Sequence, residues 1–287
     1  MKINMLYDIV KIIKELETYW PLTLRQIYYQ LVSKELIQNK QSEYKSLSRL
    51  LVKAREDNSI SWNCMIDRTR NYYQVPIHCN YRHFVNERIK FFSSDYYWHN
   101  MMQNQPKKIE VWIEKDSLSE IFKDVVNEYS INLVVCKGYP SKTFLNNFVE
   151  RNKSNHKQTL ILYFGDLDAS GINIFDTTKE YFKKRIINFD MKRYALTINH
   201  VKEFKLPHSP DAIKPKDART KDYIKKYGKY AVELDSLHPD ILTKIIHDAI
   251  KDNLDLSQFN KQLKVRESEK KQIDEIKDKL NEFFDRW

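Results

Sequence analysis

The architecture follows from one stretch of the chain, Leu160-Ile161-Leu162-Tyr163-Phe164-Gly165-Asp166-Leu167-Asp168-Ala169-Ser170-Gly171-Ile172. Its first five residues form an apolar, aromatic run with the length of a fully buried strand. The chain then breaks at Gly165 into two aspartates spaced D-x-D, and Gly171 opens a predicted helix. A buried parallel strand ends at the carboxyl edge of its sheet, where α/β folds bind their ligands. Two close carboxylates repel each other unless a cation neutralises them, and their hard oxygens suit Mg²⁺. The stretch therefore predicts a divalent-metal site.

Strands and helices alternate on both sides of this stretch. Strands are predicted over 108–114, 133–136, 160–164 and 194–198, and helices over 117–128, 141–152 and 172–184. This alternation predicts an α/β fold, with a Rossmann-like domain built on a mostly parallel four-stranded sheet. The first and third strands end at the same edge, so Glu114 is expected to meet Asp166 and Asp168 there. Lys137, in the turn after the second strand, is a candidate DNA contact.

The N-terminal third predicts a helical DNA-binding domain. Helices are expected over 5–19, 24–33 and 42–57, with Thr23 and Ser42 as caps, followed by a short strand over 59–63. Three short helices and a strand are the order of a winged helix, whose third helix is the candidate for groove binding.

Basic residues are the candidate DNA contacts of this domain. The third helix carries Lys45, Arg49, Lys53 and Arg55 mostly away from its apolar face. These side chains either contact DNA or form a solvated basic face. Arg68 and Arg70 follow the predicted wing, where they either track a DNA backbone or cap a loop.

The second helix contains two adjacent tyrosines, Tyr28 and Tyr29. They lie about 100° apart around the helix, so only one of them is expected to point into the core. Arg25 precedes Tyr29 by one turn, close enough to lower the pKa of the phenol or to hold a phosphate. A tyrosine beside a fixed cation is a candidate nucleophile for a phosphodiester, although such a pair is also common in ordinary packing.

Composition indicates an anionic partner. The 287 residues carry a formal net charge of +10, which favours nucleic acid over a membrane surface.

The sequence has no run of 18 apolar residues and no leader pattern, so neither a membrane span nor a secretion signal is expected. Cys64, Cys79 and Cys136 form no disulfide framework, which suits a reducing cytoplasm. Cys64, His78, Cys79 and His83 have zinc-binding chemistry, but their spacing matches no zinc knuckle.

The chain is divided into three parts. These are a winged-helix domain over 1–104, a metal-binding domain over 105–255 and a C-terminal helix over 256–287. Within the second part, 205–229 is rich in proline and basic residues and predicts a loop or basic arm. Glu233 and Asp235 follow it, and helix capping is the preferred interpretation over a place in the metal shell.

These motifs together resemble a known family. A glutamate ending one strand and a D-x-D with glycine ending a later one resemble the Toprim domain of topoisomerases, primases and nucleases. With the run Arg25-Gln26-Ile27-Tyr28-Tyr29 in a winged helix, the chain resembles the A subunit of topoisomerase VI and the related meiotic double-strand-break transesterase. The likeness covers about 22–70 and 108–254 and is nearest to short bacterial and phage-borne relatives.

The resemblance implies a site and partners. Tyr29 takes the place of the nucleophile that attacks DNA, with Arg25 beside the scissile phosphate. Glu114, Asp166 and Asp168 take the place of the ligands of Mg²⁺, for which Mn²⁺ is a possible substitute. A homodimer on double-stranded DNA is expected, because nucleophile and metal come from different protomers in the family. The chain has no Gly-rich nucleotide loop, so an ATPase subunit would be a separate protein.

Three functions remain open at this point. The first is Mg²⁺-dependent DNA cleavage by transesterification through Tyr29, as in topoisomerases. The second is a Toprim-type nuclease in which the same carboxylates activate water. The third is a non-catalytic protein that binds DNA or regulates another protein.

Overall fold

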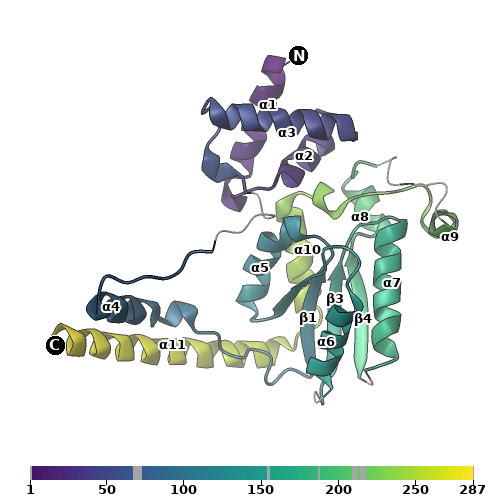
Figure 1. Cartoon of the computed structure of the whole chain (residues 1–287). Coiled ribbons are helices and arrows are strands. Elements are labelled where there is room, and N and C mark those ends of the chain that lie inside the picture. The colour runs from purple at the N-terminus through teal and green to yellow at the C-terminus, as the bar shows by residue number, and fades with distance from the viewer. Residues whose placement is uncertain are drawn as a thin grey trace.

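A four-stranded parallel sheet forms the centre of the larger unit (Figure 1). The computed structural model describes residues 2–66, 73–153, 156–186, 188–208, 213 and 218–286. The strands are β1 (Lys107–Ile113), β2 (Asn132–Val135), β3 (Gln158–Phe164) and β4 (Phe189–Ala195), in the order β2-β1-β3-β4. Val135, Ile113 and Phe164 are in register, and Phe164 pairs with Ala195, so all four strands end at one edge. The predicted α/β fold with a parallel sheet is confirmed.

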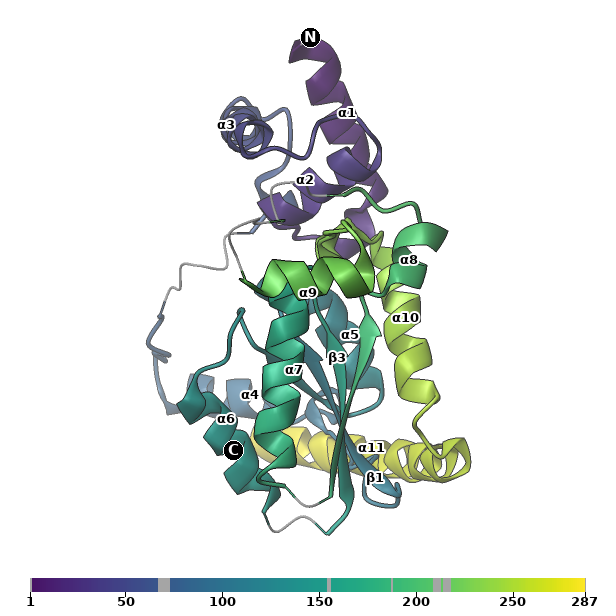
Figure 2. The ribbon, with the colours of Figure 1, turned by 90° about the vertical axis from the view of Figure 1, so that its right-hand side faces the viewer.

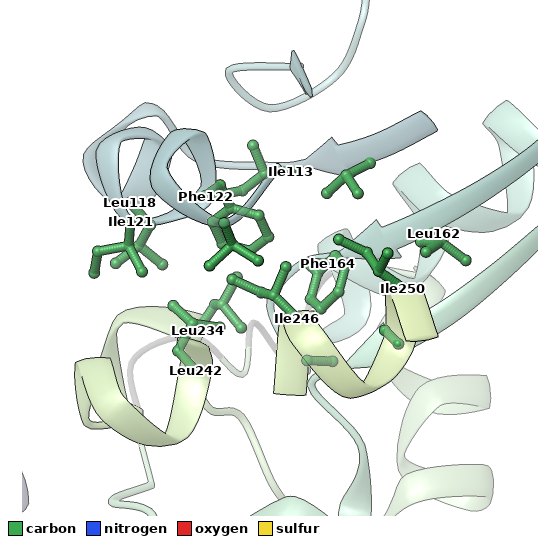
Figure 3. Close-up of a cluster of buried hydrophobic side chains, with 14 of the residues drawn as sticks. Ile113, Leu118, Ile121, Phe122, Leu162, Phe164, Leu234, Leu242, Ile246 and Ile250 are labelled. Atoms are coloured by element: carbon green, nitrogen blue, oxygen red, sulfur yellow. The ribbon is translucent and has the colours of Figure 1, made fainter. Parts of the chain in front are cut away.

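Helices cover both faces of the sheet, because side chains alternate between faces along each strand. The helices α5 (Ser119–Glu128) and α10 (Pro239–Lys251) cover one face, whereas α6 (Lys142–Asn152) and α7 (Ala169–Lys183) cover the other (Figure 2). On the first face Phe122 and Phe164 meet edge to face, with ring centroids 5.0 Å apart, beside Ile246 (Figure 3). Trp112, the residue before Ile113, points into the other core.

A separate helical unit lies over the carboxyl edge of the sheet (Figure 1). It consists of α1 (Lys2–Glu15), η1 (Glu17–Tyr19), α2 (Leu24–Ser33), α3 (Gln41–Glu56) and η2 (Trp62–Cys64), with its own apolar core. The predicted bounds of α2 are confirmed, as is its cap: the Thr23 hydroxyl accepts from the Gln26 amide in a capping box. Ser42 lies inside α3, whose cap position is Lys40.

The strand predicted over 59–63 is wrong. The Ile60 amide instead donates to the Ala54 carbonyl at 3.1 Å, which holds the chain against the end of α3. The Ser61 hydroxyl then accepts from the Asn63 amide and begins the short helix η2. Just after this region, the Leu22 backbone forms an isolated parallel bridge with Met65.

The segment before the sheet joins the C-terminal helix. The helix α4 (Tyr81–Phe91) and the turn η3 (Ser94–Tyr96) lie along α11 (Leu256–Asp285), which extends away from the sheet (Figure 1). Ser94 donates to Asp274 at 2.9 Å, and Tyr97 donates to Glu269 at 2.6 Å. The first 104 residues therefore contribute to two places, the helical unit over 2–66 and this arm.

Two further segments differ from the predicted elements. The strand expected over 194–198 ends at Ala195, because the Thr197 hydroxyl accepts from the His200 amide and begins α8 (Ile198–Glu203). The predicted loop over 205–229 contains α9 (Ala218–Tyr227) within its described part.

Two short 3-10 turns connect to helices of the larger unit: the chain reaches α10 through η6 (Leu234–Ser236), and η4 (Asp116–Leu118) precedes α5. Among the described helices, none combines the length and the apolar character needed to cross a membrane.

Candidate functional site

The turn between β3 and α7 depends on two glycines. The Gly165 amide donates to Ala195 at 2.8 Å, and the Leu196 amide donates back to Gly165 at 2.7 Å. A Cβ at Gly165 would lie 2.6 Å from Glu114 Oε2, and one at Gly171 would lie 2.3 Å from the Asp166 carbonyl oxygen. Because neither position has room for a side chain, the turn can close tightly against Glu114.

Arg193 of β4 fixes the same turn from the side. Its guanidinium donates to the carbonyl oxygens of Gly165 at 2.8 Å, of Gly171 at 3.3 Å and of Asp166, and its Nε donates to Leu196 at 3.2 Å. The Gly165 carbonyl also accepts from the Leu196 amide, so the guanidinium reinforces a turn that is already partly held by backbone hydrogen bonds. Sequence reasoning missed Arg193, because the strand predicted over 194–198 begins one residue after it, whereas β4 begins at Phe189.

Three acidic side chains meet at this edge, and we call Asp166, Glu233 and Asp235 the carboxylate cluster. One oxygen of each lies within 4.8 Å of the others, and the side chains are 8%, 18% and 0% exposed. The backbone brings them together, because Leu167 and Val232 exchange hydrogen bonds in an isolated antiparallel bridge. The interpretation of Glu233 and Asp235 as helix caps is wrong, since Glu233 makes no side-chain cap bond and Asp235 lies within η6.

Two cations neutralise the carboxylate cluster. Lys115 Nζ lies 2.6 Å from Asp166 Oδ2 and 3.2 Å from Asp235 Oδ2, and it also pairs with Glu233. Arg25 of α2 pairs with Glu233 and lies 3.2 Å from Asp235. Burial alone would raise the pKa of Asp235, but the charges of Lys115 and Arg25 lower it below its usual value. Sequence reasoning missed Lys115, although it directly follows Glu114 at the strand end.

The predicted metal ligands separate into different roles in the structure. Glu114 meets Asp166 as expected, with its Oε2 accepting from the Asp166 amide at 3.1 Å. Burial, and then the charge of Asp166, raise the pKa of Glu114 to about 7. Asp168 instead caps α7, where its Oδ1 accepts from the Gly171 amide at 2.6 Å, and burial raises its pKa. The structure thus gathers Asp166 with Glu233 and Asp235, with Glu114 behind the turn.

The candidate nucleophile lies beside the cluster in the same chain. Tyr29 is 6% exposed, and the Arg25 guanidinium carbon lies 5.3 Å from the centre of its ring. Burial raises the pKa of Tyr29; the charge of Arg25 opposes this, whereas the charges of Asp235 and Asp166 add to it. Its hydroxyl makes no hydrogen bond within the described part of the chain. The phenol therefore remains protonated at neutral pH.

The expectation that only one of the two tyrosines is buried is wrong, since Tyr28 is 3% exposed. Tyr28 packs in the helical unit, whereas the neighbouring face of α2 is covered by the segment around η6. Gln30 Nε2 donates to the Leu237 carbonyl at 3.2 Å, and Ser33 Oγ donates to the Ser236 carbonyl at 3.1 Å.

The predicted DNA contacts are spread over several surfaces. Lys45, Arg49 and Lys53 are exposed and spaced four residues apart, so they form one basic stripe on α3. Arg55 instead covers the ring of Trp62, 5.2 Å from its centre. Lys137 is exposed near the carboxyl edge, 3.2 Å from Asp116. Arg68 and Arg70 lie outside the described residues.

The chemistry of the carboxylate cluster fits Mg²⁺. It offers converging carboxylate oxygens on a rigid sheet edge, which is the ligand type that a hard divalent cation prefers. Lys115 already lies among these oxygens, so its ammonium group supplies the positive charge that the acids require. A divalent ion bound by all three carboxylates would have to displace Lys115.

Comparisons with known proteins add no family to this picture. No protein-family model matches the sequence, and no curated protein matches it.

Proposed function

We propose that this chain is a Mg²⁺-dependent DNA-cleaving protein that breaks a strand by transesterification through Tyr29. One observation carries the proposal: the Arg25–Tyr29 turn of α2 lies directly against the carboxylate cluster. A cation, a phenol and a set of hard oxygen ligands at one sheet edge are the parts needed to hold and attack a phosphodiester. The resemblance to the topoisomerase VI A subunit supports the same assignment.

Each side chain has a distinct part in this reaction. The Tyr29 oxygen forms a bond to phosphorus while the bond from phosphorus to the 3′ oxygen breaks, and the phenolic proton ends on that oxygen. The protein is then linked to the 5′ phosphate. Arg25, released from Asp235, orients the scissile phosphate through two parallel hydrogen bonds. Mg²⁺ bound by Asp166, Glu233 and Asp235 would stabilise negative charge on the phosphate.

The structure represents a closed arrangement of this site. Tyr29 is 6% exposed, so a duplex cannot reach its oxygen while α2 lies on η6. Polar contacts join the two units: Arg25 to the carboxylate cluster, Gln30 to Leu237 and Ser33 to Ser236. Tyr19 of η1 also packs against the apolar core of the sheet unit. Breaking the ion pair between Arg25 and the buried Asp235 is costly unless another cation replaces Arg25. Attack therefore requires the helical unit to move, or to serve the site of a second copy.

A second candidate function is supported by the state of Tyr29. A buried phenol with a raised pKa is a poor nucleophile until it is exposed and deprotonated. In a Toprim-type nuclease the same carboxylates would bind Mg²⁺ and activate water, and Tyr29 would only contact DNA.

The proposed partners follow from the surface and the resemblance. The basic stripe of Lys45, Arg49 and Lys53 suits the phosphates of double-stranded DNA. A homodimer would pair two sites for cutting both strands, and a separate ATPase subunit is proposed for any topoisomerase cycle. A cytoplasmic location suits the three cysteines, all of which are free.

The decisive experiment detects protein on cut DNA. Wild-type protein is incubated with supercoiled plasmid and Mg²⁺ or Mn²⁺, denatured, and the 5′ ends are tested for covalently attached protein. We expect attached protein for wild type and for the matched control Tyr28→Phe, and none for Tyr29→Phe or Asp166→Ala.

The other outcomes separate the alternatives. Cutting by Tyr29→Phe with protein-free 5′ phosphates would establish the water-dependent nuclease instead. If wild type binds DNA but never cuts it, with either metal and with a neighbouring ATPase added, the chain is a non-catalytic DNA-binding protein.

A further inference from the structure

A second group of metal-binding side chains lies far along the chain from the carboxylate cluster. We call His78, His83 and Glu87 the His–Glu cluster. His83 and Glu87 are one turn apart near the start of α4, and His78 belongs to the segment before it. One ligand atom of each residue lies within 4.8 Å of the others. Neither the proposed cleavage reaction nor the resemblance uses these residues.

The distances are close to those of a tetrahedral zinc site. His78 Nδ1 lies 2.8 Å from Glu87 Oε2, and His83 Nε2 lies 3.7 Å from Glu87 Oε1. Ligand atoms at zinc distances of about 2.0–2.1 Å are separated by about 3.3 Å in a tetrahedron. The two observed separations, which go to different oxygens of Glu87, lie on either side of this value, and zinc binding would bring both imidazoles to the carboxylate around one ion.

The surroundings orient the two imidazoles toward Glu87. The rings of His78 and His83 have centroids 5.7 Å apart, and His78 meets the ring of Phe84 edge on at 5.0 Å. Within the described residues, the ion-pair partners of Glu87 are these two imidazoles. Among the described residues, an ion here would therefore displace no lysine or arginine, unlike an ion at the carboxylate cluster.

The ligand types select the metal. Two imidazole nitrogens and one carboxylate suit Zn²⁺, whereas Mg²⁺ prefers oxygen ligands alone. The side chains of His83 and Glu87 are 46% and 39% exposed, which leaves a position open to water. Cys79 is also exposed, but it is not one of the converging ligands.

The segment that carries the His–Glu cluster buries little surface. No residue of α4 is buried, and residues 73–80 are exposed apart from the half-buried His78. A helix and a connector with so little buried surface gain much of their order from a cross-link, which a structural metal supplies. We propose that His78, His83 and Glu87 bind one Zn²⁺, with water as the fourth ligand, and that the ion holds the connector 73–80 on α4.

The test measures zinc binding by the full-length chain, by competition with a chelating dye. Wild type is expected to bind one Zn²⁺ at this site. His83→Ala and Glu87→Gln should each weaken binding by more than about tenfold, because even partners that only orient a ligand are worth ten- to hundredfold. His156→Ala, a change at another exposed histidine, and Asp166→Asn should leave it unchanged. Excess Mg²⁺ should not compete.

A second readout follows the connector itself. Zn²⁺ should slow amide hydrogen exchange over 77–91 in wild type and leave it unchanged in Glu87→Gln. The proposal is overturned if Asp166→Asn removes the bound zinc while Glu87→Gln keeps it. It is also overturned if Cys79→Ser weakens binding as much as His83→Ala, since the ligand set would then include a thiolate.

Discussion

The carboxylate cluster and the His–Glu cluster balance their acidic charge in different ways. Asp235 is fully buried, and the chain supplies Lys115 and Arg25 to neutralise it and its neighbours. Glu87 is 39% exposed and faces two imidazoles, so solvent screens much of its charge. A buried carboxylate that stays ionised requires a fixed counter-ion, whereas an exposed one does not. The first cluster is therefore tied to stability, and the second is free to gain or lose an ion.

Removing one carboxylate charge from each cluster should give the largest difference in the free energy of unfolding. Asp235→Asn leaves Lys115 and Arg25 with fewer partners in a site removed from water, and should lower the free energy of unfolding by about 3 kcal/mol. Glu87→Gln should change it by less than about 0.5 kcal/mol. Urea denaturation measures both values. Equal losses would mean that burial does not distinguish the clusters.

The two clusters should also differ in their response to pH. The pKa of Glu114, behind the carboxylate cluster, is raised from 4.5 to about 7 in the folded chain. Between these values the folded state holds a proton that the unfolded state has lost, so the free energy of unfolding falls as the pH rises from 4.5 to about 7. The fall is at most about 3 kcal/mol at 1.36 kcal/mol per pKa unit.

Urea denaturation at a series of pH values measures this slope. Glu114→Gln should flatten it, because the variant has no proton to lose, whereas Glu87→Gln should keep the wild-type slope. The assignment to Glu114 fails if both variants retain the slope unchanged.

The Mg²⁺ affinity of the carboxylate cluster should change by a smaller free energy than the stability does. Lys115 lies where a divalent ion would bind, so Lys115→Met should strengthen Mg²⁺ binding by about tenfold, which corresponds to about 1.4 kcal/mol. Lys123→Met removes an exposed lysine of α5 and should have no effect. Titration calorimetry without DNA measures both. Weaker binding by Lys115→Met would mean that the lysine organises the ligands rather than competing with the ion.

Exposed charges on α3 should affect DNA binding and leave the fold alone. Lys45→Ala and Arg49→Ala should each reduce the slope of log affinity against log salt by about 0.9, the effect of one phosphate contact. Neither change should alter the free energy of unfolding by more than about 0.5 kcal/mol. Binding to a labelled duplex at several salt concentrations tests this, and an unchanged slope in both variants would exclude the basic stripe as the DNA contact.

Local signals predicted most of the elements. Thr23 and Gln26 form the capping box that begins α2, and the apolar run 160–164 lies within β3. The meeting of Glu114 and Asp166 was also predictable, because neighbouring parallel strands end at one edge. These features depend on residues close in sequence or on a general rule of sheet topology.

The rest of the site depends on contacts that no local pattern reveals. Arg25 and Asp235 are 210 residues apart in sequence, and their pairing follows from how the helical unit lies on the sheet edge. Both Tyr28 and Tyr29 are buried in the core of the helical unit, whereas the helical period of α2 alone predicted that only one of them points inward. Likewise, Thr197 can continue a strand or cap a helix, and the bond from His200 decides for the cap.

The docking of α2 on η6 has a consequence for synthesis of the chain on the ribosome. Arg25 and Glu233 are separated by 208 residues, yet they form one ion pair. At about 5–20 residues per second, roughly 10–40 s pass between the emergence of the two partners. The helical unit has its own apolar core and can fold during that interval. The contact of α2 with η6 therefore forms only after the last third of the chain has been made.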